Sequence, residues 1–402
     1  MHTLSYKEFR FLSEAVDVTD QLKHLYHNEE HIINAGRVGY NHARDNLVSV
    51  HDMLSGIADS STRITVKIDG SPSLIAGYHP KNKQFFVATK SAFNKDPKIN
   101  YTDKDIQENH GHAPGLMAKL KEALKFLPSS MPKSGIYQGD VLFGVGDKKS
   151  VKDGAIEFTP NTITYTVAKN HPDYASVSGA KFGISFHTMY TGNPVSDHHI
   201  NGMSASFNVN QSVFRSSKDV YIMSPEINAK NMVYDTKLSK LVTSELAKAE
   251  AIHKKMTDDE YEAVRIQADT VRVYYNTKVR DGGDASAEDF KVNVGGKLYD
   301  EVDKMKSEKG KYSRLEKANE FERLLAVRKG AFDKVMKMHD HLQKAKDALV
   351  DALSSYQDFK HTVNGQLVKP EGFVVIKNNL PTKLVDRAEF SRLNFANNRG
   401  RA

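Results

Sequence analysis

The chain has 402 residues, of which 39% are hydrophobic and 27% are charged; this is enough for two or three packed domains and leaves no run of about 18 apolar residues for a transmembrane helix. It contains no cysteine, which excludes disulfides, thiolate catalysis and cysteine-based zinc sites and favours a reducing cytoplasm. Lys and Arg outnumber Asp and Glu by 57 to 50, and this modest positive excess favours polyanionic partners without requiring one.

Residues 1–60 form a first segment that the sequence predicts to be helical. Apolar side chains recur at helical spacing across residues 12–33 and 38–54, and Gly56 is a suitable helix C-cap. Lys7 and Arg10 are not followed by an apolar stretch, so we expect no signal peptide.

Residues 61–235 change to short strand-like segments separated by turn residues. The segments lie at residues 64–68, 73–78, 84–88, 135–143, 162–167 and 182–189, and one helix is expected at residues 115–126. This pattern predicts an α+β domain with a substantially antiparallel sheet.

Residues 236–362 are predicted to form a large helical insertion. Two stretches, 236–275 and 311–360, are rich in Lys, Glu, Ala and Leu at helical spacing. Between them, residues 280–297 are rich in Gly, Asp and Lys and are expected to be a loop or a small hairpin. Strand-like sequence returns at 372–377 and 382–387, so residues 363–402 are predicted to supply a final hairpin and a tail to the same core.

Several familiar motifs are missing from the sequence. His27 and His31 are one helical turn apart, but no glutamate directly follows the first, so the zinc-protease pattern is not met. We expect this stretch to be the surface of a helix. There is also no P-loop, no dinucleotide-binding glycine pattern and no Gly-x-Ser-x-Gly nucleophile elbow.

The first chemical candidate is the tetrapeptide from Lys67 to Gly70. In an extended strand the side chains alternate, so Lys67 and Asp69 are expected on one side and their apolar neighbours on the core side. A lysine at a partly buried strand end can serve as a nucleophile. Gly70 would allow a ligand to approach the backbone closely.

Two further strands carry acids and bases in a matching order. Asp140 follows a glycine in the strand-like segment 135–143, and Glu371 and Lys377 stand at the two ends of another. The separation between Glu371 and Lys377 is even, so strand alternation predicts that both point to the same face. Each segment is ordinary by itself, but their joint occurrence is much less expected by chance.

Residues 67–70 resemble the nucleotidyl-lysine motif of ATP-dependent DNA and RNA ligases and mRNA capping enzymes. Residues 137–140 resemble the third motif of that superfamily, residues 182–187 resemble the strand that follows it, and residues 371–374 are similar to its fourth motif. The resemblance covers roughly residues 60–190 and 365–390. It implies an α+β fold of the ligase-type nucleotidyltransferase kind with ATP-grasp-like antiparallel sheets, to which this sequence adds N-terminal helices and a large helical insertion.

The resemblance also implies a role for each matching residue. Lys67 would be the catalytic nucleophile, and the nucleotide would be held by a set of residues with Phe186 stacked on the purine. Glu371 and Asp140 would be the ligands of Mg²⁺ or Mn²⁺, and either Lys377 or Lys383 would contact the α-phosphate of ATP. The full nucleotide-binding set is Asp69, Gly70, Lys90, Asp140, Phe186, Lys377 and Lys383.

This sequence departs from the superfamily pattern in four ways. Asp140 replaces the usual glutamate, and Lys377 lies one residue later than in the common spacing. The helical insertion separates the fourth motif from the earlier ones. About 19 residues follow Lys383, which leaves no room for the C-terminal OB-fold of conventional DNA ligases and capping enzymes. RNA ligases often lack that module, so RNA or RNA-containing ends are the expected substrate.

The expected activity is therefore ATP-dependent joining of 5′-phosphate to 3′-hydroxyl ends through lysyl-AMP at Lys67. The alternatives are a DNA nick ligase, and a non-catalytic nucleic-acid-binding or phage assembly protein on the same fold. The residues leave ATP and GTP open. Residues 86–95 and 187–192 also resemble an uncharacterised family of tailed-phage proteins; this implies a phage-encoded enzyme in the host cytoplasm, acting on RNA or DNA ends and away from membranes.

Overall fold

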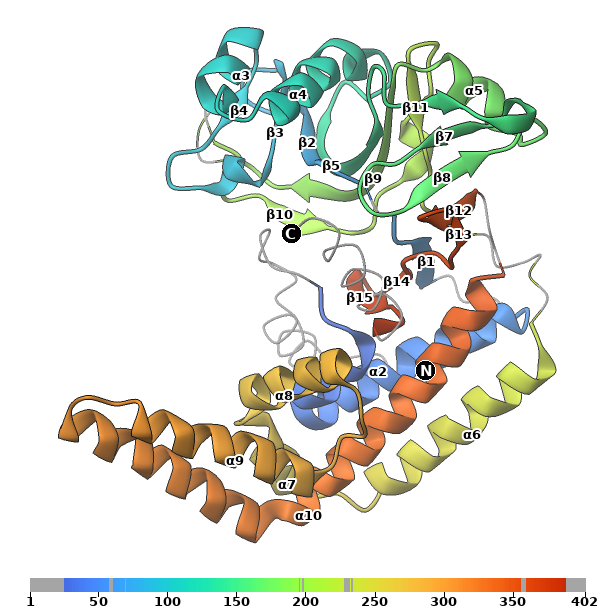
Figure 1. The fold of residues 1–402 in the computed structure, drawn as a ribbon. Helices are drawn as coiled ribbons and strands as arrows, with labels where there is room; N and C mark the ends of the chain where they lie inside the picture. The colour runs from blue at the N-terminus through green and yellow to red at the C-terminus, as the bar shows by residue number, and fades with distance from the viewer. Residues whose placement is uncertain are drawn as a thin grey trace.

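The protein consists of a β-rich half and a helical half, with a small sheet between them (Figure 1). The computed structural model describes residues 25–57, 61–68, 70–194, 196, 199–227, 232, 234–355 and 359–387. Within the described residues, the strands of the three sheets pair antiparallel except β11 with β9. The α+β class with antiparallel sheets that the sequence predicts is confirmed.

A seven-stranded sheet forms the floor of the β-rich half. Its order is β10-β9-β5-β2-β3-β4, and β11 pairs with β9. The helices α3 (Asp103–His110) and α4 (Pro114–Phe126) pack on one face through Ile106, Leu120 and Ala123. The strands are β2 (Ser73–Tyr78), β3 (Phe85–Ala88), β4 (Ile99–Asn100), β5 (Gly135–Phe143), β9 (Phe182–Thr191), β10 (Ser204–Ser206) and β11 (Val220–Ile222).

A five-stranded sheet completes this half and collects strands from both sides of the helical insertion. Its order is β13-β12-β8-β7-β6. Because β12 begins at Lys360, the chain returns to the β-rich half before the predicted boundary at residue 362. The elements are β6 (Lys149–Ser150), β7 (Ile156–Phe158), β8 (Thr164–Val167), β12 (Lys360–Val363), β13 (Gln366–Leu367) and the short helix α5 (Tyr174–Gly179).

The helical half is built around one long helix. Helix α10 has 46 residues and is therefore about 70 Å long; it packs on α2, α6, α7 and α9. Figure 1 shows α9 and the first part of α10 extending together away from the rest of the molecule. The helices are α2 (His31–Leu54), α6 (Thr236–His253), α7 (Asp258–Arg265), α8 (Ala268–Asp281), α9 (Ala287–Asp303) and α10 (Glu308–Leu353).

The loop or hairpin predicted at residues 280–297 is wrong. Helix α8 reaches Asp281, and α9 begins at Ala287, where the Ser286 hydroxyl accepts a hydrogen bond from the backbone of Asp289. Phe290 is fully buried against Phe321 and Phe332. This packing outweighs the low helix propensity of the two glycines inside α9.

A three-stranded sheet connects the two halves. It has the order β1-β14-β15, and its strands are β1 (Thr62–Val66), β14 (Phe373–Lys377) and β15 (Leu380–Leu384). Phe373 and Val375 belong to the large core cluster formed with the helices. The outer edge of β15 is covered by the chain at Tyr26, whose carbonyl accepts the amide of Lys383 at 3.0 Å. The final hairpin is therefore held from both sides.

The strand-like segments predicted in the core are confirmed, with shifts of at most three residues at their ends. Helical structure predicted for residues 12–24 lies outside the described residues. The surface helix expected around His27 and His31 is wrong, because His31 and Glu29 are fully buried and residues Asn28–Glu30 form a 3-10 turn, η1. Among the described residues, no helix is long and apolar enough to cross a membrane.

Candidate functional site

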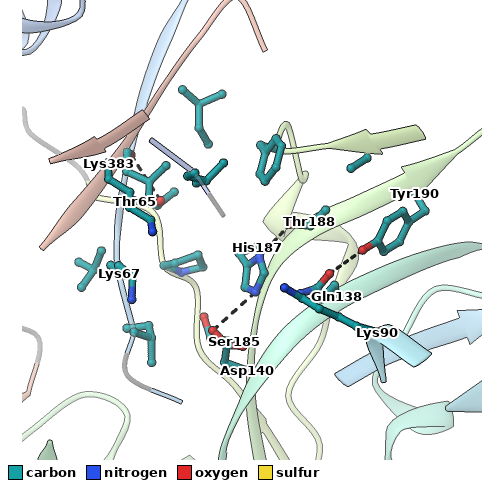
Figure 2. A pocket seen from close by; sticks show the side chains of 18 residues that line it. Thr65, Lys67, Lys90, Gln138, Asp140, Ser185, His187, Thr188, Tyr190 and Lys383 are labelled. Atoms are coloured by element: carbon teal, nitrogen blue, oxygen red, sulfur yellow. Dashed lines mark hydrogen bonds and ion pairs between the residues drawn. The ribbon is translucent and has the colours of Figure 1, made fainter. Parts of the chain in front are cut away.

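A cavity of about 220 Å³ lies between the β14–β15 hairpin and the floor strands β5 and β9 (Figure 2). Its wall combines cations, one carboxylate and hydroxyl groups with apolar side chains from the hairpin. The lining residues that the argument uses are Lys67, Lys90, Gln138, Asp140, Ser185, His187, Thr188, Tyr190, Val374, Ile376 and Lys383. Four of the predicted site residues, from widely separated parts of the chain, are therefore in one place.

Lys67 follows directly on β1 and is fixed by the neighbouring strand. Its backbone amide donates to the carbonyl of Gly372 at 2.9 Å, which extends the pairing of β1 with β14 by one residue. The side chain is 29% exposed and forms an ion pair with Glu371. The amine thus sits at the cavity wall, partly shielded from water.

Gly70 is required by a close approach of two backbones. A Cβ atom at this position would lie 2.6 Å from the Cβ of Asp140, which is closer than real contacts allow. The chain after Lys67 can therefore run alongside β5 only if it carries no side chain there. Asp69 lies outside the described residues.

Glu371 lies two residues before the start of β14 at Phe373, so its side chain does not follow the alternation of that strand and contacts Lys67. Gly372 has φ of 151°, and a Cβ there would lie 2.6 Å from the carbonyl oxygen of Leu384. The strand alternation that predicted Glu371 and Lys377 on one face does not extend across this glycine, so that prediction is wrong. The Glu371 side chain is only 7% exposed.

Asp140 faces the cavity from β5 and pairs with a histidine of β9. Its Oδ2 lies 3.6 Å from Nε2 of His187. Burial raises the pKa of Asp140, but His187, a hydrogen bond from Ser73 and the charge of Lys67 together outweigh burial and leave the pKa below its ordinary value. Asp140 therefore carries a negative charge in the cavity at neutral pH.

The hairpin decides between the two late lysines. Val374, Ile376 and Lys383 face the cavity, and β14 residue 374 is paired with β15 residue 383. Lys377 lies an odd number of residues from Val374 and Ile376, so it points to the opposite face of the hairpin. There it contacts Ser49 and the carbonyl of Asp45 on α2. Of these two late lysines, Lys383 is therefore the one that can meet a ligand in the cavity.

Besides burial, the pKa of Lys383 responds to the charges of Lys67 and Glu371, which indicates that these groups lie close to it. Burial lowers the pKa of Lys383, the charge of Lys67 lowers it further, and Glu371 acts in the opposite direction. A cavity that holds two such amines together favours a ligand with negative charge, because an anion relieves their repulsion.

Phe186 does not line the cavity, and the choice of this residue as the purine-stacking aromatic is wrong. Its side chain is fully buried and stacks on Phe214 with centroids 4.6 Å apart. The cause is a β-bulge: Gln138 pairs with Thr188, whereas Gly139 pairs with Phe186, so His187 is the extra residue. The bulge turns His187 to the cavity and Phe186 to the core.

Lys90 enters the cavity from the 3-10 turn η2 (Lys90–Phe93) after β3. Figure 2 shows its side chain on the same side of the cavity as Gln138 and Tyr190, with Lys67 and Lys383 on the opposite side. Thr89 accepts a hydrogen bond from the amide of Ser91 and starts this turn. Lys90 therefore lines the cavity, and its contact with a nucleotide stays a prediction.

Sequence reasoning missed several cavity residues, of which His187, Gln138 and Ser185 are the most polar. The Ser185 hydroxyl is buried and has no hydrogen-bond partner among the described residues. Alternation along β5 from Asp140 would have indicated Gln138, which lies two residues away on the same face. The bulge at His187 left no comparable signal in the sequence.

Fold and cavity together define an α+β protein with a small cavity lined by three lysines and the carboxylate of Asp140. By sequence, the chain belongs to a family of unknown function, DUF6267, whose model matches residues 21–399. A search of curated proteins and a search of solved structures gave no match.

Proposed function

We propose that this protein is an ATP-dependent polynucleotide ligase with a ligase-type nucleotidyltransferase core, in which Lys67 becomes covalently linked to AMP. The observation that carries the proposal is that Lys67 contacts Glu371 and shares one cavity with Asp140 and Lys383. These residues come from four segments spread over more than 300 positions. RNA or RNA-containing ends are the proposed substrate, and the host cytoplasm of a tailed phage is the proposed setting.

The first chemical step requires an uncharged amine at Lys67. The Glu371 carboxylate touches the amine and is placed to receive a proton from it. The Lys67 nitrogen then forms a bond to the α-phosphorus of ATP, while the bond from that phosphorus to the bridging oxygen of the β-phosphate breaks and pyrophosphate leaves. Lys383, on the same side of the cavity as Lys67, offsets negative charge on the phosphate oxygens.

The carboxylates present fit a magnesium ion. Asp140 and Glu371 supply oxygen atoms, which Mg²⁺ prefers, and one or two carboxylates together with substrate phosphates suffice. Within the described residues no group of three or more acidic or histidine side chains forms a complete protein cage for a metal. When bound, the metal stabilises charge on the transferring phosphate.

Two further transfers would complete the reaction. A 5′-phosphate oxygen attacks the phosphorus of lysyl-AMP, which breaks the nitrogen–phosphorus bond and returns the Lys67 amine. A 3′-hydroxyl then attacks the activated 5′-phosphate, AMP leaves, and a phosphodiester is formed.

The proposal is tested by covalent labelling with ATP that carries the label on its α-phosphate. Wild-type protein should take up label in an acid-labile bond, and Lys67→Ala should take up none. Lys104→Ala is the matched control, because Lys104 is an 83% exposed lysine on α3 and lies outside the cavity. Labelling of Lys67→Ala at the wild-type level would contradict the proposal. Joining assays with nicked RNA, nicked DNA and single-stranded RNA then identify the preferred ends.

A further inference from the structure

The side of the cavity away from Lys67 has a polar group that the reaction does not use. Gln138 lies on β5 two residues before Asp140 and faces the cavity with 8% of its surface exposed. Figure 2 shows Lys67 and Gln138 on opposite sides of the cavity, with Asp140 and His187 between them. Two strand residues span about 7 Å, so Gln138 lies roughly one ribose ring beyond Asp140.

The carboxamide of Gln138 is held in one orientation by two neighbours. Its Nε2 donates to the Ser73 hydroxyl at 3.0 Å, and its Oε1 accepts the Tyr190 hydroxyl at 2.5 Å. Tyr190 is 2% exposed, so its hydroxyl is held close to the amide in a dry environment. Such second contacts keep a recognition group from rotating to suit a different ligand.

The held amide keeps one donor and one acceptor for a ligand. An amide nitrogen has two hydrogens and an amide oxygen has two lone pairs, and the structure shows one contact for each among the described residues. Leaving a nearly buried polar group without a hydrogen-bond partner is unfavourable in free energy. A ligand that fills both positions would therefore bind preferentially.

We infer that Gln138 reads the base of the nucleotide and selects adenine over guanine. The N6 amino group and N7 of adenine offer a donor next to an acceptor, which a carboxamide matches with two hydrogen bonds. The corresponding edge of guanine offers two acceptors, O6 and N7, so one of them would face the oxygen of Gln138. This inference rests on the proposed function, because it assumes that the cavity holds the nucleotide.

The test compares ATP with GTP in both binding and covalent labelling. A good two-bond contact to a base discriminates by roughly 10- to 100-fold, and we expect this preference for ATP in the wild-type protein. Gln138→Met removes both hydrogen-bonding groups and should bring the ATP-to-GTP ratio close to one. Tyr190→Phe leaves Gln138 in place but releases it, and should lower the ratio by a smaller factor.

Gln211→Met is the matched control. Gln211 donates to the carbonyl of Phe186 and does not line the cavity, so the ratio should stay at the wild-type value. Calorimetric titration of each variant with ATP and with GTP measures affinity independently of labelling, and melting curves show that each variant is folded. Gln138→Asn, with a shorter amide, gives a second measure if Gln138→Met melts early.

The outcomes separate this inference from the proposed function. If wild-type protein is labelled but Gln138→Met keeps the same ATP-to-GTP ratio, the role of Gln138 is overturned and the ligase proposal stands. If wild-type protein prefers GTP, the adenine assignment is overturned. If no nucleoside triphosphate binds or labels the protein, both proposals are overturned.

Discussion

The two faces of the β14–β15 hairpin carry polar residues of similar type in different surroundings: one face lines the cavity, and the other packs against helix α2. On one face, Lys383 enters the cavity beside Val374 and Ile376. On the other face, Thr382 and Lys377 point to helix α2, where the Thr382 hydroxyl lies within 3.2 Å of His31, His42 and Asn46. Adjacent residues of one strand therefore belong to two different polar regions.

The helix-side region is almost closed to water. Its deepest ion pair joins Lys346 of α10 to Glu29 at 3.2 Å, with neither side chain exposed, and Lys346 also donates to the carbonyl of Val385 just after β15. In the cavity, by contrast, Ser185, Gln138 and Lys90 have capacity for further hydrogen bonds. Helix-side groups such as Glu29, His31 and Asn46 also keep atoms without a partner among the described residues, so the two regions differ in access. The comparison teaches that the buried helix-side groups hold the hairpin in place, whereas cavity side chains such as Lys67 and His187, which are 29% and 36% exposed, are open to a ligand.

The largest expected effect on labelling is on the cavity side. Lys383→Met should lower the rate of Lys67 labelling by about 100-fold, because removing one preorganised donor to a developing charge typically costs that much. The melting temperature should change little, because the side chain of Lys383 lines the cavity and does not pack in the hydrophobic core. Single-turnover labelling at saturating ATP measures the effect, and a rate within threefold of wild type, on the order of 0.6 kcal/mol, would assign the phosphate contact elsewhere.

The second prediction breaks the helix-side region at its deepest pair. Lys346→Met leaves the Glu29 carboxylate buried without its cation, and the free energy of unfolding should fall by about 3–5 kcal/mol. Urea titration measures it. Lys369→Ala is the control, because its ion pair with Asp351 is about half exposed and should contribute less than about 1 kcal/mol. Equal losses in the two variants would remove the distinction between the closed and the open region.

A third prediction uses pH to sharpen the same contrast. Burial lowers the pKa of His42 and of His339 from 6.5 to about 4, so the folded protein keeps them neutral where the unfolded chain is protonated. The unfolded state thus binds more protons between about pH 6.5 and 4, and stability must fall as pH decreases through that window. Melting temperatures across this range measure it. His42→Gln should flatten the curve, and an unchanged slope would exclude His42 as a cause.

The smallest effect is expected for Lys377→Met. This lysine contacts Ser49 and the carbonyl of Asp45 and no cavity group, so its loss should cost about 1–2 kcal/mol of stability and leave labelling per folded molecule at the wild-type rate. The same labelling and urea experiments are done on Lys383→Met, so the effects of the two hairpin lysines on labelling and on stability can be compared directly. A large loss of labelling in Lys377→Met alone would reverse the assignment.

The sequence predicted most core strands and one composite site, because alternation and motif order are local properties. Lys67, Asp140 and Lys383 were proposed together from short segments, and they share one cavity. The helix α9 was missed for the opposite reason: its glycines argue locally against a helix, and only the burial of Phe290 against Phe321 and Phe332 stabilises it.

What the sequence by itself determined is which residue types are present and in what order along the strands. Tertiary structure alone decided which of them meet. One extra residue at His187 reverses the parity of β9 and turns Phe186 to the core, and Gly372 breaks the alternation between Glu371 and Lys377. Because strand side chains have a period of two, a single bulge or a single glycine exchanges the two faces, and a local pattern does not record that exchange.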